Sequence, residues 1–202
     1  MPEFTAITPT GLADLIAARA AALPGAAVLA IDGADAADPV ALAGQVADRL
    51  RTGGRPAEVI ALHDFVRPAS LRLEYDRADE FTYRTAWFDY EALNREVLVA
   101  LRQHGQWLPA LWDERTDRSA RARIRPAAPD TVLLVAGPML LGRALDFDLT
   151  VSLRMSAGAL RRRTAPADLF TVEALGAHQD AHAAEPDILV AWDHPDRPAV
   201  RA

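Results

Sequence analysis

Apolar residues along the chain fall into two kinds of run, and their alternation predicts the fold class. Short runs that are apolar throughout predict buried strands; they cover residues 27–31, 57–62, 131–136, 149–155 and 187–192. Longer segments with apolar residues at helical spacing predict helices; they cover residues 11–23, 39–50, 89–104 and 166–182, with a shorter helix through 161–163. Strands without a polar face that alternate with helices are typical of a parallel sheet covered on both sides. The pattern therefore predicts an α/β fold.

The remaining segments carry no such period. Residues 66–88 are polar and aromatic, residues 105–130 contain an arginine cluster, and the tail 193–202 is rich in proline. We expect the first two to be irregular and the tail to be extended. A chain of 202 residues is expected to form a single domain. Within it we expect an N-terminal helix in residues 1–24 and a lid-like helical region at about 156–182.

Ligands of open parallel sheets bind beyond the C-terminal ends of the strands. Four polar or glycine-containing segments follow predicted strands and should therefore lie on one rim: Asp32-Gly33, His63-Asp64, Ala136-Gly137 and Asp193.

Composition narrows the classes of function. A net charge of −6 disfavours broad binding to nucleic acid, which needs a basic face. No apolar run approaches the ~20 residues that cross a membrane, and the N-terminus lacks the pattern of a signal peptide. We therefore expect a cytoplasmic protein that binds neither nucleic acid nor membrane.

Two residue types are missing from the sequence. Without cysteine there is no thiol nucleophile and no thiolate metal site. All 22 basic residues are arginine, so no mechanism that requires a lysine ammonium group is open to this chain.

The segment after the first long strand has the layout of a phosphate-binding loop. It reads IDGADAADPVALA over residues 31–43, and Asp38-Pro39-Val40 stands where such a loop ends in Gly-Lys-Ser/Thr. Asp38 is a good helix N-cap, and proline suits the first helical position. From these residues alone, the segment is either an altered phosphate site or an ordinary strand-to-helix turn.

Further segments follow in a fixed order along the chain: Asp64-Phe65-Val66-Arg67, Trp87 to Leu93, Trp112-Asp113, Val132 to Gly137, Arg161 to Arg163 and Pro186-Asp187-Ile188. Together with the 31–43 segment they resemble the uridine kinase and phosphoribulokinase family of P-loop kinases, especially the actinobacterial uridine-kinase-like proteins. The resemblance covers roughly residues 25 to 200. It implies a P-loop NTPase fold of three α/β/α layers with a parallel sheet and a partial lid.

The resemblance also implies binding of ATP and Mg²⁺. The residues of this chain at the corresponding positions, however, have different chemistry. The positions of the second glycine, the lysine, the hydroxyl residue and the Walker B acid hold Asp38, Pro39, Val40 and Ala136. Carboxylates at Asp35 and Asp38 repel phosphate, and proline removes a backbone donor. We therefore expect a degenerate phosphate loop that no longer binds ATP, Mg²⁺ or another metal; its residues are Gly33, Asp35, Asp38, Pro39 and Val40.

The acceptor side of the site, which binds the substrate that receives the phosphate, is better preserved in this resemblance. Asp64 matches the carboxylate that takes the proton of a nucleoside 5′-hydroxyl, although an aspartate at a strand end is also a common cap or turn former. The candidate substrate-binding residues are His63, Phe65, Arg67, Asp76, Tyr83 and Trp112. The aromatic residues among them can stack on a base, or belong to the core.

Two other clusters carry weaker signals. Arg161, Arg162 and Arg163 are either a lid that once closed on phosphate or a charged helix end favoured by the helix dipole. His178 and His182 have the i, i+4 spacing of metal ligands, but no motif surrounds them, and we expect a solvated helix face.

Three functions remain open. We favour a catalytically impaired kinase-like protein that keeps a nucleoside-like small-ligand pocket. The alternatives are an active nucleoside or small-molecule kinase that uses Asp64 as base and an arginine in place of the lysine, and a structural module that binds a protein partner or a second copy of itself.

Overall fold

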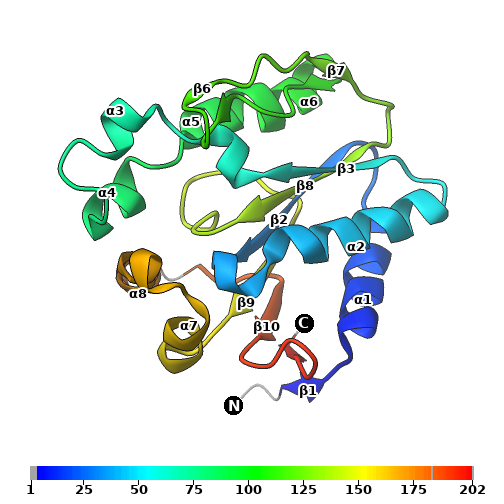
Figure 1. The fold of residues 1–202 in the computed structure, drawn as a ribbon. Helices are drawn as coiled ribbons and strands as arrows, with labels where there is room; N and C mark the ends of the chain where they lie inside the picture. The colour runs from blue at the N-terminus through cyan, green and yellow to red at the C-terminus, as the bar shows by residue number, and fades with distance from the viewer. Residues whose placement is uncertain (1–3, 183, 202) are drawn as a thin grey trace.

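The computed structural model describes residues 4–182 and 184–201. At its centre lies a seven-stranded sheet with the order β1-β11-β10-β9-β2-β8-β3 (Figure 1). Its strands are β1 (Thr5–Ala6), β2 (Ala27–Gly33), β3 (Ala57–Ala61), β8 (Val132–Gly137), β9 (Leu149–Arg154), β10 (Ile188–Ala191) and β11 (Ala199–Arg201). The run from β10 to β3 is parallel throughout, as the apolar runs predicted.

One edge of the sheet differs from the prediction. β11 pairs antiparallel with β10, and β1 pairs antiparallel with β11. The tail was expected to be extended; it turns back and adds one strand, β11, with which β1 from the N-terminal segment pairs. Strands of two and three residues are too short to leave a period in the sequence.

Helices cover both faces of the sheet, which confirms the predicted three-layer α/β/α architecture. α1 (Pro9–Ala21) and α2 (Pro39–Thr52) pack on one face. The other carries the helix predicted at 89–104, which consists of α5 (Tyr90–Leu93), a π-helical turn (Asn94–Val99) and α6 (Ala100–His104). α7 (Ala157–Arg163) and α8 (Leu169–Ala181) lie next to each other near the end of β9 (Figure 1).

The central strand β2 is apolar throughout because it feeds two cores. Leu29 and Ile31 pack toward α1 and α2, whereas Val28 and Ala30 pack toward the helix of residues 90–104. Successive side chains of a strand point to opposite faces, and all four are fully buried. Complete burial of a side chain such as Leu29 contributes about 1.5–3 kcal/mol relative to exposure.

Both segments predicted to be irregular contain short regular elements. Residues 66–88 include α3 (Ala69–Arg72) and α4 (Glu80–Thr85), and residues 105–130 include two short antiparallel pairs: β4 (Gln106–Trp107) with β7 (Arg125–Pro126), and β5 (Trp112–Asp113) with β6 (Arg118–Ser119). α4 begins at Asp79, whose carboxylate accepts a hydrogen bond from the Thr82 N–H at 2.6 Å. Such elements are set by caps and tertiary contacts, and are too short for a periodic pattern.

Glycine at the end of β8 lets two strand ends meet. A Cβ at Gly137 would lie 2.5 Å from the Cβ of Leu62, and the residue has a φ of +158°. Leu62 opens the 3₁₀ turn η2 (Leu62–Phe65), which follows β3 directly. The close approach therefore holds His63 and Asp64 at the same rim as the ends of β2 and β8, as predicted.

α7 and α8 fall within the expected lid region of residues 156–182. The organisation of the chain as a single domain stays a prediction. Of the helices in the described part of the chain, none has the length and apolar character needed to cross a membrane.

Candidate functional site

A cavity of about 400 Å³ opens at the C-terminal rim of the sheet; we call it the rim cavity. One side is the turn after β2, and the others come from the turn after β3, from α4 and the segment that follows it, and from the α7–α8 region. Its wall includes Ala34, Asp35, His63, Tyr83, Trp87, Glu114, Arg163, Asp168 and Phe170. The turn after β2 and the turn after β3 therefore share one cavity.

His63 joins two carboxylates at this rim. Its Nε2 lies 3.1 Å from Oδ1 of Asp35, and its Nδ1 lies 2.7 Å from Oε2 of Glu114. Burial lowers the pKa of His63, but the hydrogen bonds and charges of Asp35 and Glu114 outweigh it and raise the pKa to about 10. The imidazole is therefore protonated at neutral pH, and both ring N–H groups donate.

Glu114 is held by a second cation and an indole. Its Oε1 accepts hydrogen bonds from Nη1 of Arg72 at 3.0 Å and from Nε1 of Trp87 at 2.9 Å. Burial raises the pKa of Glu114, but its bonds to His63 and Trp87 and the charge of Arg72 bring it below its usual value. Arg72 is only 5 % exposed, and its guanidinium carbon lies 5.1 Å from the centre of the Trp87 ring. These contacts fix one wall of the rim cavity.

The predicted substrate residues divide into two groups. His63 and Tyr83 line the rim cavity. Phe65 does not, because η2 turns its side chain into the core, where it is fully buried. Its predicted role as a stacking platform is therefore replaced by a role in packing.

Arg67, Asp76 and Trp112 also lie outside the wall of the rim cavity. The carbonyl of Arg67 accepts a hydrogen bond from Nε of Arg72 at 2.6 Å. The carboxylate of Asp76 accepts from the next two backbone N–H groups and shapes an exposed turn. Trp112 donates through Nε1 to Asp117 at 2.9 Å.

Asp64, the predicted general base, is not part of the cavity wall either. Its neighbour His63 takes that place, because consecutive side chains of a 3₁₀ turn point in different directions. Burial raises the pKa of Asp64; the charge of His63 opposes this shift and Asp113 reinforces it. His63, and not Asp64, therefore lines the rim cavity.

The altered loop ends in a capped helix. After the 3₁₀ turn η1 (Asp35–Ala37), Asp38 adopts a left-handed conformation with φ 52° and ψ 58°, and its carboxylate accepts from the Ala41 N–H at 3.1 Å. Pro39 occupies the first turn of α2. This confirms the predicted cap.

The residues at this loop do not provide the donor set that a P-loop uses for Mg²⁺ and polyphosphate. Pro39 has no N–H, and the N–H of Ala41 is already engaged. The side chain at position 40 is an exposed valine, and Ala136 is fully buried within β8. Among the residues that the structure describes, no group of three His, Asp or Glu side chains gathers as metal ligands.

Of the three predicted lid arginines, Arg163 reaches the wall of the rim cavity, and Arg161 and Arg162 do not. All three are exposed at the end of α7.

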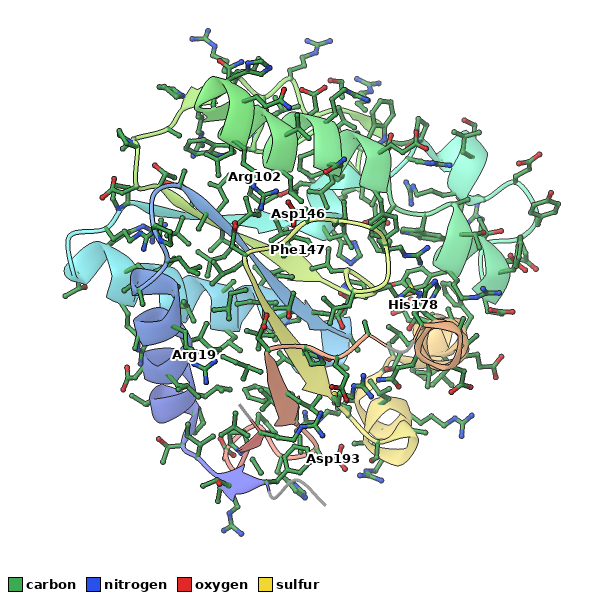
Figure 2. The ribbon with its side chains drawn as sticks, turned by 180° about the vertical axis from the view of Figure 1, so that it is seen from behind. Arg19, Arg102, Asp146, Phe147, His178 and Asp193 are labelled. Carbon is green, nitrogen blue, oxygen red and sulfur yellow. The ribbon has the colours of Figure 1, made fainter. Side chains whose placement is uncertain are left out.

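The expectation of a solvated His178 is wrong. The residue is 7 % exposed, and its Nε2 donates to the carbonyl of Leu141 at 2.8 Å. Figure 2 shows it between α8 and the loop that follows β8. Burial lowers the pKa of His178 to about 4. A helix with small residues on several sides gives little indication of which face is buried.

Sequence reasoning missed Arg72 and Glu114. Arg72 lies in a helix of four residues, and Glu114 lies in the connection between β5 and β6. Neither has a local motif, because their contact joins parts of the chain that are 42 residues apart.

Solved structures share this architecture. A possible uridine kinase from Bacillus stearothermophilus superimposes with a TM-score of 0.71 at 20% identity, over 88% of this chain and 96% of that one. Phosphoribulokinase from Rhodobacter spheroides gives 0.54 at 12% identity, over 81% of this chain and 68% of that one. D-glycerate 3-kinase from Cryptococcus neoformans gives 0.50 at 14% identity, over 76% and 74%.

The chain has the P-loop kinase fold of the uridine kinase and phosphoribulokinase group. The rim cavity lies beside the turn that follows β2. No model of a protein family and no curated protein matches the sequence.

Proposed function

We propose that this protein is a catalytically impaired, uridine-kinase-like protein that binds a nucleoside-like small molecule in the rim cavity and does not transfer phosphate from ATP. The observation that carries the proposal is the Asp38-Pro39 cap of α2. Asp38 places a carboxylate on the helix N-terminus that a P-loop reserves for phosphate, and it occupies the N–H of Ala41.

The negative charge after the end of β2 also supports the proposal that the protein does not transfer phosphate from ATP. The carboxylate of Asp35 points to His63 and is held there at 3.1 Å. A polyphosphate entering from this side would meet the carboxylates of Asp35 and Asp38, and the cation beside Asp35, His63, is already bonded to Asp35 and Glu114. Like charges at ~4–6 Å repel strongly in a partly buried site.

The rim cavity has the properties of a small-molecule site. Its volume of about 400 Å³ lies in the range of ~300–1,000 Å³ that is usual for such pockets. Tyr83, Trp87 and Phe170 provide aromatic surface, and the Tyr83 and Phe170 rings meet edge to face at 5.6 Å. Asp168 adds a carboxylate that can accept from sugar hydroxyls. Flat bases pack on aromatic rings, and hydroxyl groups need acceptors.

The second candidate is an active kinase with a rearranged phosphate site. Its supporting observation is Arg163, an exposed guanidinium on the wall of the rim cavity. In this case Arg163 replaces the lost lysine and Asp64 acts as base. Arginine restores positive charge but provides no metal ligand, which is why we place this candidate second. A purely structural or partner-binding role, with a protein partner or a second copy, is the third candidate.

Calorimetry separates these functions. Uridine and Mg²⁺·ATP are titrated separately into the protein, and a uridine phosphorylation assay is run in parallel. We expect heat of binding for uridine, none for Mg²⁺·ATP at millimolar concentration, and no turnover. Micromolar affinity for ATP with turnover that Asp64→Asn or Arg163→Ala abolishes would establish the second candidate. Binding of neither uridine nor ATP would leave the structural role.

A restored loop provides the positive control. The variant Asp38→Gly, Pro39→Lys, Val40→Thr, Ala136→Asp returns the glycine, the cation, the hydroxyl and the acid to their positions. We expect it to gain affinity for Mg²⁺·ATP, because charge-assisted hydrogen bonds to phosphate contribute ~1.5–3 kcal/mol each. If it gains none although it folds, the four replaced side chains are not what prevents ATP binding.

A further inference from the structure

A second cavity, of about 120 Å³, lies between the ends of β2 and β9 and the helices α7 and α8. We call it the lid cavity. It shares Ala34 and Leu175 with the rim cavity, so the two spaces meet at the turn after β2. The proposed nucleoside site does not include it.

Asp32, Ser152 and Arg154 form a polar end of the lid cavity. Asp32 and Ser152 are register partners in the neighbouring parallel strands β2 and β9, and Arg154 follows Ser152 by two residues. Because the side chains of a strand alternate between its two faces, these three side chains stand on one face of the sheet. Asp32 is partly exposed and Arg154 is exposed. A ligand at this end of the cavity can therefore reach both charged groups.

The polar end combines one negative and one positive charge. Oδ1 of Asp32 accepts from the Leu140 N–H at 2.8 Å, and a carboxylate can accept ~four hydrogen bonds. Burial raises the pKa of Asp32 to about 6, against the effects of two backbone N–H groups, the charge of Arg154 and a hydrogen bond from Ser152. The carboxyl group is therefore mostly ionised at pH 7. Arg154 acts on it through charge and not through a hydrogen bond, so both groups can still bind a ligand.

The remaining wall of the lid cavity is mostly aliphatic. It includes Met139, Leu153, Met155, Leu160, Val172 and Leu175. An apolar cavity of ~150 Å³ binds benzene. A volume of about 120 Å³ therefore suits an apolar group of about four carbon atoms. Apolar walls with a few convergent polar groups are typical of ligand sites.

We propose that the lid cavity binds an α-amino acid with an aliphatic side chain of the size of leucine. The ammonium group of the ligand pairs with the Asp32 carboxylate, its carboxylate pairs with the Arg154 guanidinium, and its side chain packs against the aliphatic wall. A ligand with a single charge would leave the other protein charge partly desolvated and without a partner, which costs free energy. The proposal does not depend on whether the rim cavity binds a nucleoside.

Leucine and two truncated relatives provide a direct test. 4-Methylpentanoate lacks only the ammonium group of leucine, and 3-methylbutylamine lacks only its carboxylate. Each is titrated into protein labelled with ¹³C at the methionine methyl groups, because Met139 and Met155 line the lid cavity. We expect saturable shifts of both signals with leucine. We expect affinities lower by about tenfold or more for the truncated relatives, a loss of about 1.4 kcal/mol.

Variants that remove one charge show which protein group binds which end of leucine. Arg154→Gln should weaken leucine binding by about tenfold but should not weaken binding of 3-methylbutylamine, which has no carboxylate. Asp32→Asn should weaken leucine binding by the same factor but should not weaken binding of 4-methylpentanoate. The matched control is Arg161→Gln, which removes the same charge from an exposed residue of α7 outside the lid cavity. It should leave leucine binding unchanged.

Three results would overturn the proposal. They are Met139 and Met155 signals that do not respond to leucine, a truncated relative that binds as tightly as leucine, and an Arg154→Gln variant that binds leucine like Arg161→Gln. Arg154 is exposed at the end of β9, so its replacement leaves the core intact. The test therefore holds even if Asp32→Asn fails to fold.

Discussion

Nδ1 of His63 lies 2.7 Å from Oε2 of Glu114, across 51 residues of chain. The contact connects the turn after β3 to the segment between β5 and β6. Because Asp35 holds the other ring nitrogen, a single imidazolium joins the turn after β2 to the segment that carries Glu114. This arrangement determines the charge of the site and makes the stability of the fold depend on pH.

Protonated His63 should stabilise the fold in a defined pH window. Its folded pKa of about 10 is above the unfolded value of ~6.5. The stabilisation is therefore complete below about pH 6.5 and is lost as the pH rises toward 10. Since the side chain is about one-third exposed, solvent screening limits the effect to about 1–2 kcal/mol. Urea unfolding between pH 6 and 10 should show this decline in the wild type, and a smaller one in His63→Gln. Equal slopes for both proteins would contradict the assignment.

Arg72 should be essential to the wall of the rim cavity. It is buried and bonds to Glu114 and Asp117. Removing one partner of a buried pair leaves an uncompensated charge and costs about 3–5 kcal/mol. We therefore expect Arg72→Met to destabilise the protein by about 3 kcal/mol in urea unfolding, since Glu114 is only partly buried.

The matched control for Arg72 is the double variant Arg72→Met, Glu114→Gln. It should recover part of the loss because no Glu114 carboxylate is left without Arg72, although Asp117 and His63 each lose one charged partner. Additive effects of the two substitutions would show that Arg72 and Glu114 do not interact energetically.

Asp38 should behave as a helix cap in a left-handed conformation. Asp38→Ala removes the bond to the Ala41 N–H and forces a side chain without local hydrogen bonding to keep a φ of 52°. We expect a loss of about 1–2 kcal/mol in thermal or urea unfolding. Asp38→Asn keeps the acceptor and tolerates the conformation, so it should stay within about 0.5 kcal/mol of the wild type. A loss of stability in Asp38→Asn as large as that in Asp38→Ala would rule out the cap.

Gly137 should not accept any side chain. A Cβ there would overlap Leu62, which is fully buried and cannot move away. We expect Gly137→Ala to destabilise the protein by about 2 kcal/mol or more. The control is Gly176→Ala, in a helix with open space, which should stabilise by about 0.5–1 kcal/mol. Circular dichroism melts of both variants test the contrast.

Much of the fold could be predicted from local patterns. The five parallel strands, the two helical layers and the cap at Asp38 each follow from residues close together in sequence. Buried strands must be apolar on both faces, and a helix start needs an acceptor for its free N–H groups. The short elements α3, α4 and β4 to β7 could not be predicted, because they contain too few residues for a period.

The site depended on contacts that no local pattern encodes. The choice between His63 and Asp64 follows from the direction of a 3₁₀ turn pressed against Gly137. The Arg72–Glu114 pair joins segments 42 residues apart, and the burial of His178 depends on the loop after β8.

Local sequence is enough to specify a parallel sheet and a helix that begins at the Asp38 cap with Pro39 in its first turn. Those features rest on side-chain burial, backbone donors and the conformational limits of proline, which act over a few residues. Which polar side chains meet depends on the folded chain, because electrostatic and hydrogen-bonding partners are set by distance in space and not along the sequence. For that reason the rim cavity contains His63 between Asp35 and Glu114, and His178 is buried with its Nε2 on the carbonyl of Leu141.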